Sequence, residues 1–460
     1  MTVRSPDDPI AALATPAASS ALAVIRVSGP GSLELLAPLV AGRFDPVSAA
    51  GHTLHYCVLK DGEERVDEVL LAVYRAPRSF TGEDGAEIFC HGSLPVIARL
   101  LSLLTRSGFR AAGPGEFTQR AFLNGRMGLT QAEAVNEIVR ARTDRARGLA
   151  LQRLGGAIES RVRRAREALV DLRASLEVLI DYAEDRDADS LDPDGGHGEA
   201  VDLAPLDEAE GVLESLVRTY RQGRVYQEGV TVAIAGATNA GKSSLFNLLL
   251  RQDRAIVSEV HGTTRDWLEG TASIEGIPVR LMDTAGLRYS SDPLESEGIR
   301  RTREVIGAAD AVLFLVDGTR GIGEEDQRFL DGWEGPGALL RAWNKADLPG
   351  VLPAPGGFLP VSAVTGEGLG EVQRAIAAAA LGGAPVDGSE PLVDSERQRD
   401  LLVRALEAVA RLRRAAAGGA TPDLLAVDLA DALDALGEIT GEVTSAEILD
   451  RMFSRFCVGK

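Results

Sequence analysis

The residues best suited to chemistry lie in the run GATNAGKS, residues 236–243. A short apolar segment, 230–235, precedes this run, and a segment typical of a helix, 244–250, follows it. Glycines let backbone N–H groups turn toward an anion, and a helix N-terminus favours negative charge. Lys242 can reach the β- and γ-phosphates of a nucleotide, and the Ser243 hydroxyl can bind Mg²⁺. The run therefore predicts a phosphate-binding loop between a strand and a helix.

A second motif offers groups for the metal ion and the terminal phosphate. The run DTAG occupies 283–286 and follows the apolar segment 278–282. The carboxylate of Asp283 can hold the hydration shell of Mg²⁺, and the N–H of the last glycine can meet a γ-phosphate. Between the two motifs, the run GTTRD at 262–266 offers Thr264 as a second hydroxyl ligand for Mg²⁺.

A third motif indicates which base is bound. The run NKAD ends at Asp347 and follows the apolar segment 339–343. The carboxylate of Asp347 can accept two hydrogen bonds from the N1 and N2 donors of guanine, a pair that adenine lacks. Ser362 and Ala363 follow the next predicted strand, where a backbone N–H can meet guanine O6. The three motifs appear in the order that a single GTP-binding domain requires.

The residue that activates water is less clear from the motifs alone. In Ras-like enzymes a glutamine after the DxxG glycine orients the attacking water, but here Leu287 stands at that position and cannot hydrogen-bond. Carboxylates follow at Asp292, Glu295 and Glu297, and at least two of the three are expected to be solvated. His261 is a weaker candidate base, because its loop is predicted to face solvent. Hydrolysis therefore needs a different residue, an ion or a partner.

The composition indicates a multidomain globular protein. The chain has 460 residues, which is too long for a single hydrophobic core. Its residues are 45% hydrophobic and 25% charged, a composition typical of globular proteins and not of disordered ones. Its net charge of −19 argues against a broad phosphate-binding surface. Arginine runs within 161–166 and 411–414 are candidates for a local RNA contact, but a solvated helix face is the favoured interpretation.

The cysteines and the apolar segments indicate a cytosolic protein. Cys57, Cys90 and Cys457 are odd in number and lack metal-ligand spacing, so neither a disulfide framework nor a zinc site is expected. The sequence shows no signal-peptide pattern and no apolar run long enough to span a bilayer. We therefore expect a cytoplasmic location and no membrane partner.

The periodicity along the chain suggests how these motifs are positioned. Strands are predicted at 21–27 and 69–74 and a helix at 95–104, so the first 120 residues should be mixed α/β. The run 130–182 is helical, with a capping box at Thr130 and Glu133, and a loop or a short broken helix is expected at 181–210.

The second half of the chain should contain an inserted domain. A helix is predicted at about 206–223, followed by strands alternating with helices over 230–380, typical of a parallel sheet covered on both faces. After a Gly/Pro break at 382–391 the chain returns to helix. An economical arrangement packs the helices before and after the α/β block together.

Segments outside the nucleotide motifs carry a resemblance to a known family. They are SFTGED at 79–84 with CHG at 90–92, PGEFT at 114–118 running into RAFLNG at 120–125, and FCVGK at 456–460. With GTTRD, DTAGLR and NKAD, they make the chain similar over essentially its full length to the MnmE (TrmE) family of bacterial tRNA modification GTPases, which are TrmE-Era-Septin-like GTPases. Most other small GTPases would share only the nucleotide motifs.

The resemblance implies a multidomain α/β and α fold in three parts. These are an N-terminal α+β dimerisation and tetrahydrofolate-binding domain, 1–122, a discontinuous helical domain, 123–223 plus 385–460, and an inserted Ras-like P-loop GTPase domain, 224–384. It also implies a homodimer that joins the FAD-bearing protein MnmG (GidA) in a heterotetramer. That complex would add a carboxymethylaminomethyl or aminomethyl group to C5 of the wobble uridine of certain tRNAs, with 5-formyl- or 5,10-methylene-tetrahydrofolate as the one-carbon source.

The resemblance also implies how the missing glutamine is replaced. A potassium ion beside the phosphates would be held by Asn239 and by loop oxygens at Ser258, Val260 and Thr263. A fixed cation there stabilises the charge that grows in a loose transition state. The family's catalytic glutamate falls on Glu295, which would act through water.

The predicted nucleotide-binding set combines the motifs with this resemblance. Its members are Asn239, Ala240, Gly241, Lys242, Ser243, Ser244, Ser258, Glu259, Val260, His261, Gly262, Thr263, Thr264, Asp283, Thr284, Ala285, Gly286, Asn344, Lys345, Asp347, Ser362 and Ala363. Ser243 and Thr264 would bind Mg²⁺.

For the folate, the resemblance implies Arg26, Glu87, Arg126 and Lys460. A pterin ring offers donors to a carboxylate, and its glutamate tail offers carboxylates to Arg or Lys. Arg126 stands where the family commonly has Lys, which keeps the charge but not the geometry. Cys457 matches a residue considered catalytic in the family, although a small buried hydrophobic residue is an equal alternative.

Two other functions remain open at this point. A GTPase switch in ribosome assembly would share the GTP-binding domain but should carry a basic RNA-binding module. A nucleotide-gated scaffold with little turnover would explain Leu287 as lost catalysis. Turnover in KCl compared with NaCl separates an enzyme from a scaffold.

Overall fold

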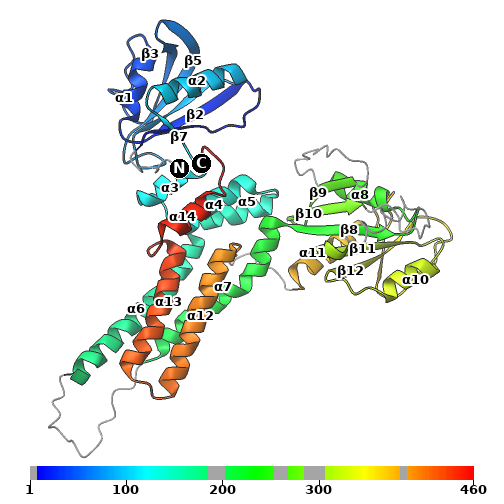
Figure 1. Ribbon diagram of the computed structural model, residues 1–460. Helices are drawn as coiled ribbons and strands as arrows, with labels where there is room; N and C mark the ends of the chain where they lie inside the picture. The colour runs from blue at the N-terminus through cyan, green and yellow to red at the C-terminus, as the bar shows by residue number, and fades with distance from the viewer. Residues whose placement is uncertain (1–7, 185–201, 253–267, 284–305, 384–390) are drawn as a thin grey trace, which may run out of the picture. The chain divides into compact units, whose positions relative to one another are not determined.

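The computed structural model describes residues 8–184, 202–252, 268–283, 306–383 and 391–460 (Figure 1). They divide into two compact units. The first combines Met1–Asn136 with Leu436–Lys460, and the second is Glu137–Ala435. The predicted domain boundaries at 122/123, 223/224 and 384/385 stay predictions.

The first unit contains a seven-stranded sheet in the order β3-β4-β5-β6-β2-β1-β7. Its strands are β1 Ile10–Leu13, β2 Leu22–Ser28, β3 Val40–Ala41, β4 Thr53–Asp61, β5 Glu64–Tyr74, β6 Gly85–His91 and β7 Arg110–Ala111. Neighbouring strands are antiparallel, except that β1 and β7 are parallel. The strands predicted at 21–27 and 69–74 are confirmed as β2 and as part of β5.

One face of this sheet is covered by helices α1 Ser32–Leu36 and α2 Leu94–Arg106 (Figure 1). Ile25, Leu71 and Ile88 from the strands pack there with Leu100 of α2, and all four are buried. The predicted helix at 95–104 is confirmed. Its cap is Ser93, whose hydroxyl accepts the N–H of Val96.

The opposite face carries apolar side chains in one row, and two apolar and two charged side chains in the next. The cross-strand register makes the apolar row Tyr56, Leu70, Phe89 and Val24. The next row is Leu54, Ala72, Glu87 and Arg26. The side chains of Leu22, Leu54 and Tyr56 are about three-fifths exposed, at 60%, 59% and 64%. In the described part of the first unit this face therefore stays largely uncovered.

Three helices accompany the sheet, and the first segment of this unit ends at Asn136 within the second of them. They are α3 Glu116–Leu123, α4 Leu129–Arg140 and α14 Ala446–Phe453. A small core joins them through Leu129, Leu449, Phe453 and Phe456. The predicted capping box at Thr130 is wrong, because α4 begins one residue earlier and Gln131 accepts the N–H of Gly128.

The helical part of the second unit is formed by α5 Asp144–Leu154, α6 Ala157–Glu184, α7 Ala204–Glu228, α12 Glu396–Ala417 and α13 Pro422–Thr440. The predicted apolar stripe of 162–180 lies along α6, whose Val162, Leu169 and Leu176 are buried. The helical run of 130–182 is three helices, because Thr143 caps α5 and a Gly-Gly turn at 155–156 precedes α6. For 181–210, predicted as a loop or a short broken helix, the loop alternative is wrong at both ends, which lie in α6 and α7, and residues 185–201 lie outside the described ranges.

Segments before and after the α/β block lie together, as the sequence suggested. The Thr219 hydroxyl of α7 accepts the N–H of Val393 at 3.1 Å. Gly223 makes this approach feasible, since a Cβ at that position would overlap the carbonyl of Val393. The guanidinium of Arg153, almost completely buried, reaches the Leu392 carbonyl, Glu137 and Asp394.

The α/β block is a six-stranded sheet in the order β13-β12-β11-β8-β10-β9. The strands are β8 Val230–Gly236, β9 Leu268–Ile274, β10 Ile277–Asp283, β11 Ala311–Asp317, β12 Ala338–Asn344 and β13 Phe358–Pro360. All neighbours are parallel except β9 and β10, so the fully parallel prediction is wrong at this edge. Helices α8 Lys242–Gln252 and α11 Leu369–Leu381 pack on one face, and α10 Glu324–Asp331 packs on the other.

None of the helices in the described ranges is long and apolar enough to cross a membrane.

Candidate functional site

The phosphate loop lies where the sequence predicts it, between the end of β8 and the start of α8. Asn239 and Gly241 have left-handed φ values of 67° and 97°. A Cβ at Gly241 would overlap the side-chain amide of Asn344, so only glycine fits this position. The left-handed residues turn the backbone around the loop, so that its N–H groups can surround an anion.

Lys242 is the first residue of α8 and is largely buried, with 8% of its surface exposed. Its ammonium group donates to the carbonyls of Gly236 and Ala237 at 3.0 and 2.9 Å. Burial lowers the pKa of Lys242, and the carboxylates of Asp283 and Asp326 oppose that shift. The ammonium therefore lies against the start of the phosphate loop, where a triphosphate would bind.

Ser243 and Asp283 form the predicted magnesium corner. The Ser243 hydroxyl donates to Asp283 Oδ2 at 2.7 Å. The other carboxylate oxygen, Oδ1, is buried and lacks a hydrogen-bond partner among the described residues. A buried carboxylate oxygen without a partner is costly, and the hydration shell of a divalent cation would satisfy it. The donor set, one hydroxyl and one carboxylate, fits Mg²⁺.

Asn344 connects three loops of the site and is 1% exposed. Its side-chain amide donates to the Ala240 carbonyl of the phosphate loop at 2.7 Å. Its side-chain oxygen accepts the N–H of Ala363 at 3.0 Å. One asparagine thus fixes the phosphate loop against the loop predicted to meet guanine O6.

The base-binding side of the site is formed by Asp347 and the loop that begins at Ser362. The Asp347 side chain is exposed and forms no hydrogen bond or ion pair with the described residues, so its oxygens are available to a base. Ser362 is fully buried, and its hydroxyl accepts the N–H groups of Val364 and Thr365. These bonds hold Ala363 in place beside Asn344.

Sequence reasoning missed Asp317 at the end of β11. Lys345 donates to Asp317 Oδ2 at 2.6 Å, and the Thr319 hydroxyl donates to Oδ1 at 2.6 Å. Burial alone would raise the pKa of Asp317, but these hydrogen bonds outweigh it and the pKa lies below its usual range. The sequence signal that could have identified Asp317 was an aspartate at the carboxyl end of an apolar run. Ligands of parallel sheets bind at the carboxyl ends of the strands.

The remaining predicted nucleotide and ion ligands lie outside the described residues. They are Ser258, Glu259, Val260, His261, Gly262, Thr263, Thr264, Thr284, Ala285, Gly286 and Glu295. Leu287, Asp292 and Glu297 lie outside as well. Ser244 is described and is exposed on the first turn of α8.

A second candidate site is a pocket of about 230 Å³ in the first unit. Arg26 and Glu87 are neighbours across β2 and β6, and Arg26 Nε donates to Glu87 Oε1 at 2.7 Å. Tyr74 donates to the other oxygen of Glu87 at 3.4 Å. Arg26 also donates to the carbonyl of Gly459 at 3.1 Å, which brings the end of the chain to the sheet.

The structure brings three of the four predicted folate residues into this pocket. Arg26, Glu87 and Lys460 line it. Burial and the neighbouring Arg26 lower the pKa of Lys460. Arg126 does not line it, although its side chain lies beside Gly82 in the loop that does.

Cys457 does not line the pocket, although Lys460, three residues further along the chain, does. Its side chain is exposed, so the alternative of a small buried hydrophobic residue is wrong. Its carbonyl accepts the N–H of Gly115, which ties the FCVGK run to the PGEFT run. Cys57 and Cys90 are buried, and burial raises the pKa of each thiol to about 11.

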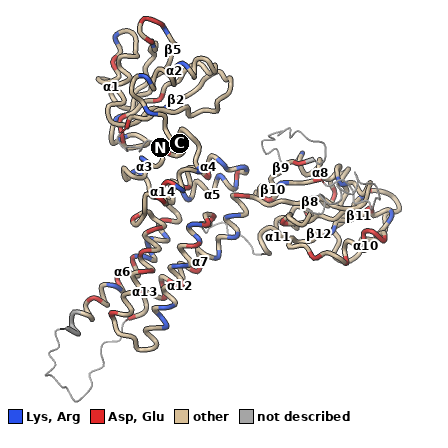
Figure 2. The backbone as a smooth tube through the Cα atoms, viewed as in Figure 1, with Lys and Arg blue, Asp and Glu red and all other residues tan. Residues whose placement is uncertain are grey.

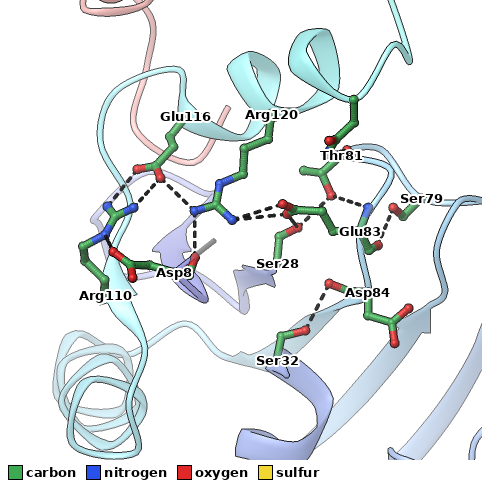
Figure 3. Close-up of polar contacts among 11 residues, drawn as sticks. Asp8, Ser28, Ser32, Ser79, Thr81, Glu83, Asp84, Arg110, Glu116 and Arg120 are labelled. Carbon is green, nitrogen blue, oxygen red and sulfur yellow. Dashed lines mark hydrogen bonds and ion pairs between the residues drawn. The ribbon is translucent and has the colours of Figure 1, made fainter. Parts of the chain in front are cut away.

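The diagnostic segments of the first unit meet in one buried ion network (Figure 3). Arg120 is 3% exposed and donates to Glu83 at 3.2 Å and to Glu116 at 3.1 Å. Glu116 also accepts from Arg110 at 2.6 Å and from the Gly113 N–H at 2.8 Å. Burial opposes ionisation of Glu116, but these donors prevail and lower its pKa to about 2.

The arginine runs considered for RNA are largely paired with acidic residues. Arg163 pairs with Glu159 and Arg164 with Glu208. Arg411 pairs with Asp428 and Asp431, and Arg413 with Asp207 and Glu210. Figure 2 shows basic and acidic residues interspersed along α6, α7 and α12, while the charged residues of α13 are all acidic. The favoured interpretation, solvated helix faces, agrees with this pairing.

A search of solved structures finds GTPases that match part of the chain. A crystal structure of Era from Aquifex aeolicus, bound to GDP and aluminium fluoride, matches at 25% identity over 39% of this chain and 66% of that one, with a TM-score of 0.28. That score is too low to support any conclusion about this chain.

Sequence comparison covers the chain almost completely. The family model for the MnmE helical domain matches residues 129–457, and the model for the GTP-binding protein TrmE N-terminus matches 9–126. The tRNA modification GTPase MnmE of Moorella thermoacetica is 42% identical over 99% of this chain and 100% of its own length. The protein of the same name from Carboxydothermus hydrogenoformans is 39% identical over the same shares. This chain belongs to the MnmE family of tRNA modification GTPases.

Proposed function

We propose that this chain is a potassium-activated GTP hydrolase that acts, with an FAD-containing partner, in modifying the wobble uridine of certain tRNAs. The group installed at C5 is carboxymethylaminomethyl or aminomethyl, and a tetrahydrofolate supplies the one-carbon unit. The observation that carries the GTPase part is the convergence of Lys242, the Ser243–Asp283 pair and Asn344 on one phosphate loop. The tRNA part rests on relatives near 40% identity whose names describe tRNA modification GTPases.

The nucleotide is held by groups with separate tasks. The backbone of 236–243 and the ammonium of Lys242 bind the phosphates, and Asp347 selects guanine. Mg²⁺, when bound at Ser243, Thr264 and the hydration shell beside Asp283, supplies positive charge across the β- and γ-phosphates. The buried Oδ1 of Asp283, without a partner among the described residues, supports this assignment.

The glutamine that Leu287 replaces is compensated by other groups in this proposal. A potassium ion, when bound by Asn239, Ser258, Val260 and Thr263, supplies charge near the β–γ bridge. Asn239 supports this assignment, because its exposed side chain forms no hydrogen bond with the described residues. Glu295 orients the attacking water through a second water. The remaining members of the predicted nucleotide set contact the same ligand.

The pocket at Arg26 and Glu87 binds a 5-formyl- or 5,10-methylene-tetrahydrofolate. The carboxylate of Glu87 accepts N–H donors of the pterin ring, and Lys460 with Arg126 attracts the carboxylates of the glutamate tail. Support comes from the 2.7 Å pair of Arg26 and Glu87 inside a pocket that Lys460 also lines. Cys457 lies close by on the same chain segment and is exposed, as a catalytic thiol requires.

The proposed partners are a second copy of this chain, the FAD-containing protein and tRNA. A homodimer forms through the uncovered sheet face of the first unit, whose apolar row includes Tyr56 and Leu70. Apolar patches of this kind are typical of interfaces. The dimer joins MnmG (GidA) and tRNA in the cytoplasm, without a membrane partner.

GTP turnover in KCl and in NaCl tests the hydrolase proposal. We expect potassium to accelerate turnover, and Glu295→Ala to keep GTP binding while losing most turnover. Glu334→Ala, which removes an exposed carboxylate from the same domain, is the matched control. Equal turnover in both salts would remove potassium from the mechanism, and no turnover in either salt would favour the scaffold alternative.

A further inference from the structure

The pocket of the first unit contains a second carboxylate, Glu83, besides Glu87. Glu83 lines the pocket together with Ser28 and Thr81. Ser28 and Thr81 are almost completely buried, at 3% and 4% exposed. Neither hydroxyl nor Glu83 belongs to the folate residues already proposed. The three form a polar floor that needs its own explanation.

Hydrogen bonds connect these three residues in a closed ring (Figure 3). The backbone N–H of Glu83 donates to Thr81 Oγ1 at 3.3 Å. The two hydroxyls of Thr81 and Ser28 lie 2.7 Å apart, and Ser28 Oγ donates to Glu83 Oε2 at 2.7 Å. The ring therefore runs from the main chain of Glu83 through both hydroxyls and back to its own side chain.

The carboxylate determines which group donates and which accepts in each hydrogen bond of the ring. An ionised carboxylate can only accept, so Ser28 must use its one proton on Glu83. The proton between the hydroxyls then belongs to Thr81, which donates to Ser28. Each hydroxyl has one lone pair left, and so has the carboxylate. In this arrangement the floor offers acceptors and no hydroxyl donors.

Further hydrogen bonds from neighbouring side chains hold the ring in place. Arg120 Nη1 donates to both oxygens of Glu83, at 3.2 and 3.3 Å. The side-chain amide of Asn124 donates to the Thr81 carbonyl at 2.7 Å, and Ser79 donates to the Glu83 carbonyl at 2.6 Å. These hydrogen bonds therefore fix the acceptor atoms of the floor in position before a ligand binds.

We propose that Ser28, Thr81 and Glu83 are a second recognition element of this pocket, an acceptor-only floor that selects ligands carrying N–H donors on their heterocycle. The inference rests on the proposed folate site and deepens it. A 2-amino-4-oxo-pteridine ring presents an exocyclic amino group and ring N–H groups, which match such a floor. A heterocycle that presents acceptors at the same edge would face unpaired oxygens and be rejected.

The change Glu83→Gln reverses the polarity of the floor with little change in shape. Arg120 donates to this side chain, so the new amide must keep its oxygen toward Arg120 and turn its NH₂ toward Ser28. Because the amide now donates to Ser28, the Ser28 hydroxyl donates to Thr81 instead of to residue 83. The Thr81 hydroxyl then has no acceptor in the ring, and its proton faces the ligand. The floor gains a donor where the ligand also has one.

The test measures binding to the full-length protein by calorimetry with two probes. One is 5-formyltetrahydrofolate, and the other is its analogue without the exocyclic amino group. For Glu83→Gln we expect about a tenfold or greater loss of affinity for the first probe, since hydrogen bonds to a charged group contribute about 1.5–3 kcal/mol. Affinity for the analogue should change much less. Glu63→Gln, which alters an exposed carboxylate between β4 and β5, is the matched control.

A second pair of variants keeps the test valid if Glu83→Gln folds poorly. Thr81→Ser retains the hydroxyl and should bind 5-formyltetrahydrofolate like the wild type. Thr81→Val breaks the ring and should lose about tenfold, again mainly for the probe with the amino group. A purely structural role would weaken both probes equally.

The outcomes separate this inference from the folate proposal. If Arg26→Ala abolishes binding while Glu83→Gln and Thr81→Val bind both probes as the wild type does, only the acceptor floor is wrong. An equal loss for both probes also overturns it. If the wild-type protein binds neither probe, the folate site itself is wrong and the inference fails with it.

Discussion

The nucleotide site and the pocket of the first unit are built in opposite ways. Most nucleotide groups lie in short runs at the carboxyl ends of parallel strands, where the backbone alone brings them together. The pocket joins Arg26 to Glu87 across an antiparallel sheet and to Gly459, 433 residues further along the chain. The first kind of site can be read from local spacing, whereas the second depends on the tertiary fold.

The two sites also differ in where their charges are compensated. At the nucleotide site, Lys242 donates only to main-chain carbonyls, and one oxygen of Asp283 has no partner within the described ranges. In the first unit, Arg110, Arg120, Glu83 and Glu116 form ion pairs with one another. The nucleotide site is therefore poised for charged ligands, while the network around the pocket provides rigidity.

The largest effect is expected from Lys242→Ala. Removing a cation that stabilises charge in the transition state should reduce GTP turnover by about 10²–10³-fold. Binding of 5-formyltetrahydrofolate should be unchanged, because the two sites belong to separate compact units. A turnover assay checks the loss of GTP hydrolysis, and calorimetry on the same preparation checks the binding of 5-formyltetrahydrofolate. Loss of folate binding in this variant would contradict the independence of the two sites.

The network of the first unit should show a specific pH dependence. The pKa of Glu116 is about 2 in the folded protein and near 4.3 when unfolded, so its ionisation stabilises the fold by about 3 kcal/mol at neutral pH. This stability is fully present above the unfolded pKa and is lost as the pH falls from about 4 toward 2.

Amide hydrogen exchange of β7 and α3 measures this effect. Glu116→Gln should speed exchange at neutral pH, and the difference from the wild type should shrink as the medium becomes more acid. A difference that stayed constant with pH would show that the lost stability comes from packing instead of charge.

Asp347→Asn should alter the choice of base. The amide keeps one acceptor and adds a donor, which no longer matches the two donors of guanine but matches the N1–H and C2 carbonyl of xanthine. We expect GTP affinity to fall about 100-fold and xanthosine triphosphate to bind better than it does to the wild type. Competition binding with the two nucleotides checks this, and unchanged preference for GTP would remove Asp347 from base selection.

The smallest effect is expected from Arg26→Lys. A lysine keeps the positive charge beside Glu87 but cannot reach both Glu87 and the Gly459 carbonyl as the guanidinium does. Affinity for 5-formyltetrahydrofolate should fall about fivefold to tenfold, with GTP turnover unchanged. Calorimetry decides this, with Arg43→Lys, a change outside the pocket lining, as the control.

Local patterns predicted the elements that carry nucleotide chemistry. The phosphate loop and the strands ending at Asp283 and Asn344 appear as expected, because each combines an apolar run with a turn and a helix start or strand end. The antiparallel strand β9 was missed, because a two-residue turn, and not a helix, joins it to β10. Asp317 was missed because its partner, Lys345, is 28 residues away.

The first unit was less predictable from local patterns. Arg26 and Glu87 alone would have been taken for a surface ion pair, and only the family resemblance pointed to a site. Nothing in the spacing of Ser28, Thr81 and Glu83 reveals their ring, because it depends on the register of β2 and on Arg120 from α3. The shifted start of α4 shows how a side chain at Gln131 can override a motif at Thr130.

Nucleoside analysis of wobble uridines in tRNA tests the central claim most directly. The tRNA would come from cells lacking this protein and supplied with either the wild-type chain or Lys242→Ala. The account predicts that the C5 substituent is absent without the protein, returns with the wild type and does not return with Lys242→Ala. Full modification in cells without the protein, or with the variant alone, would contradict it.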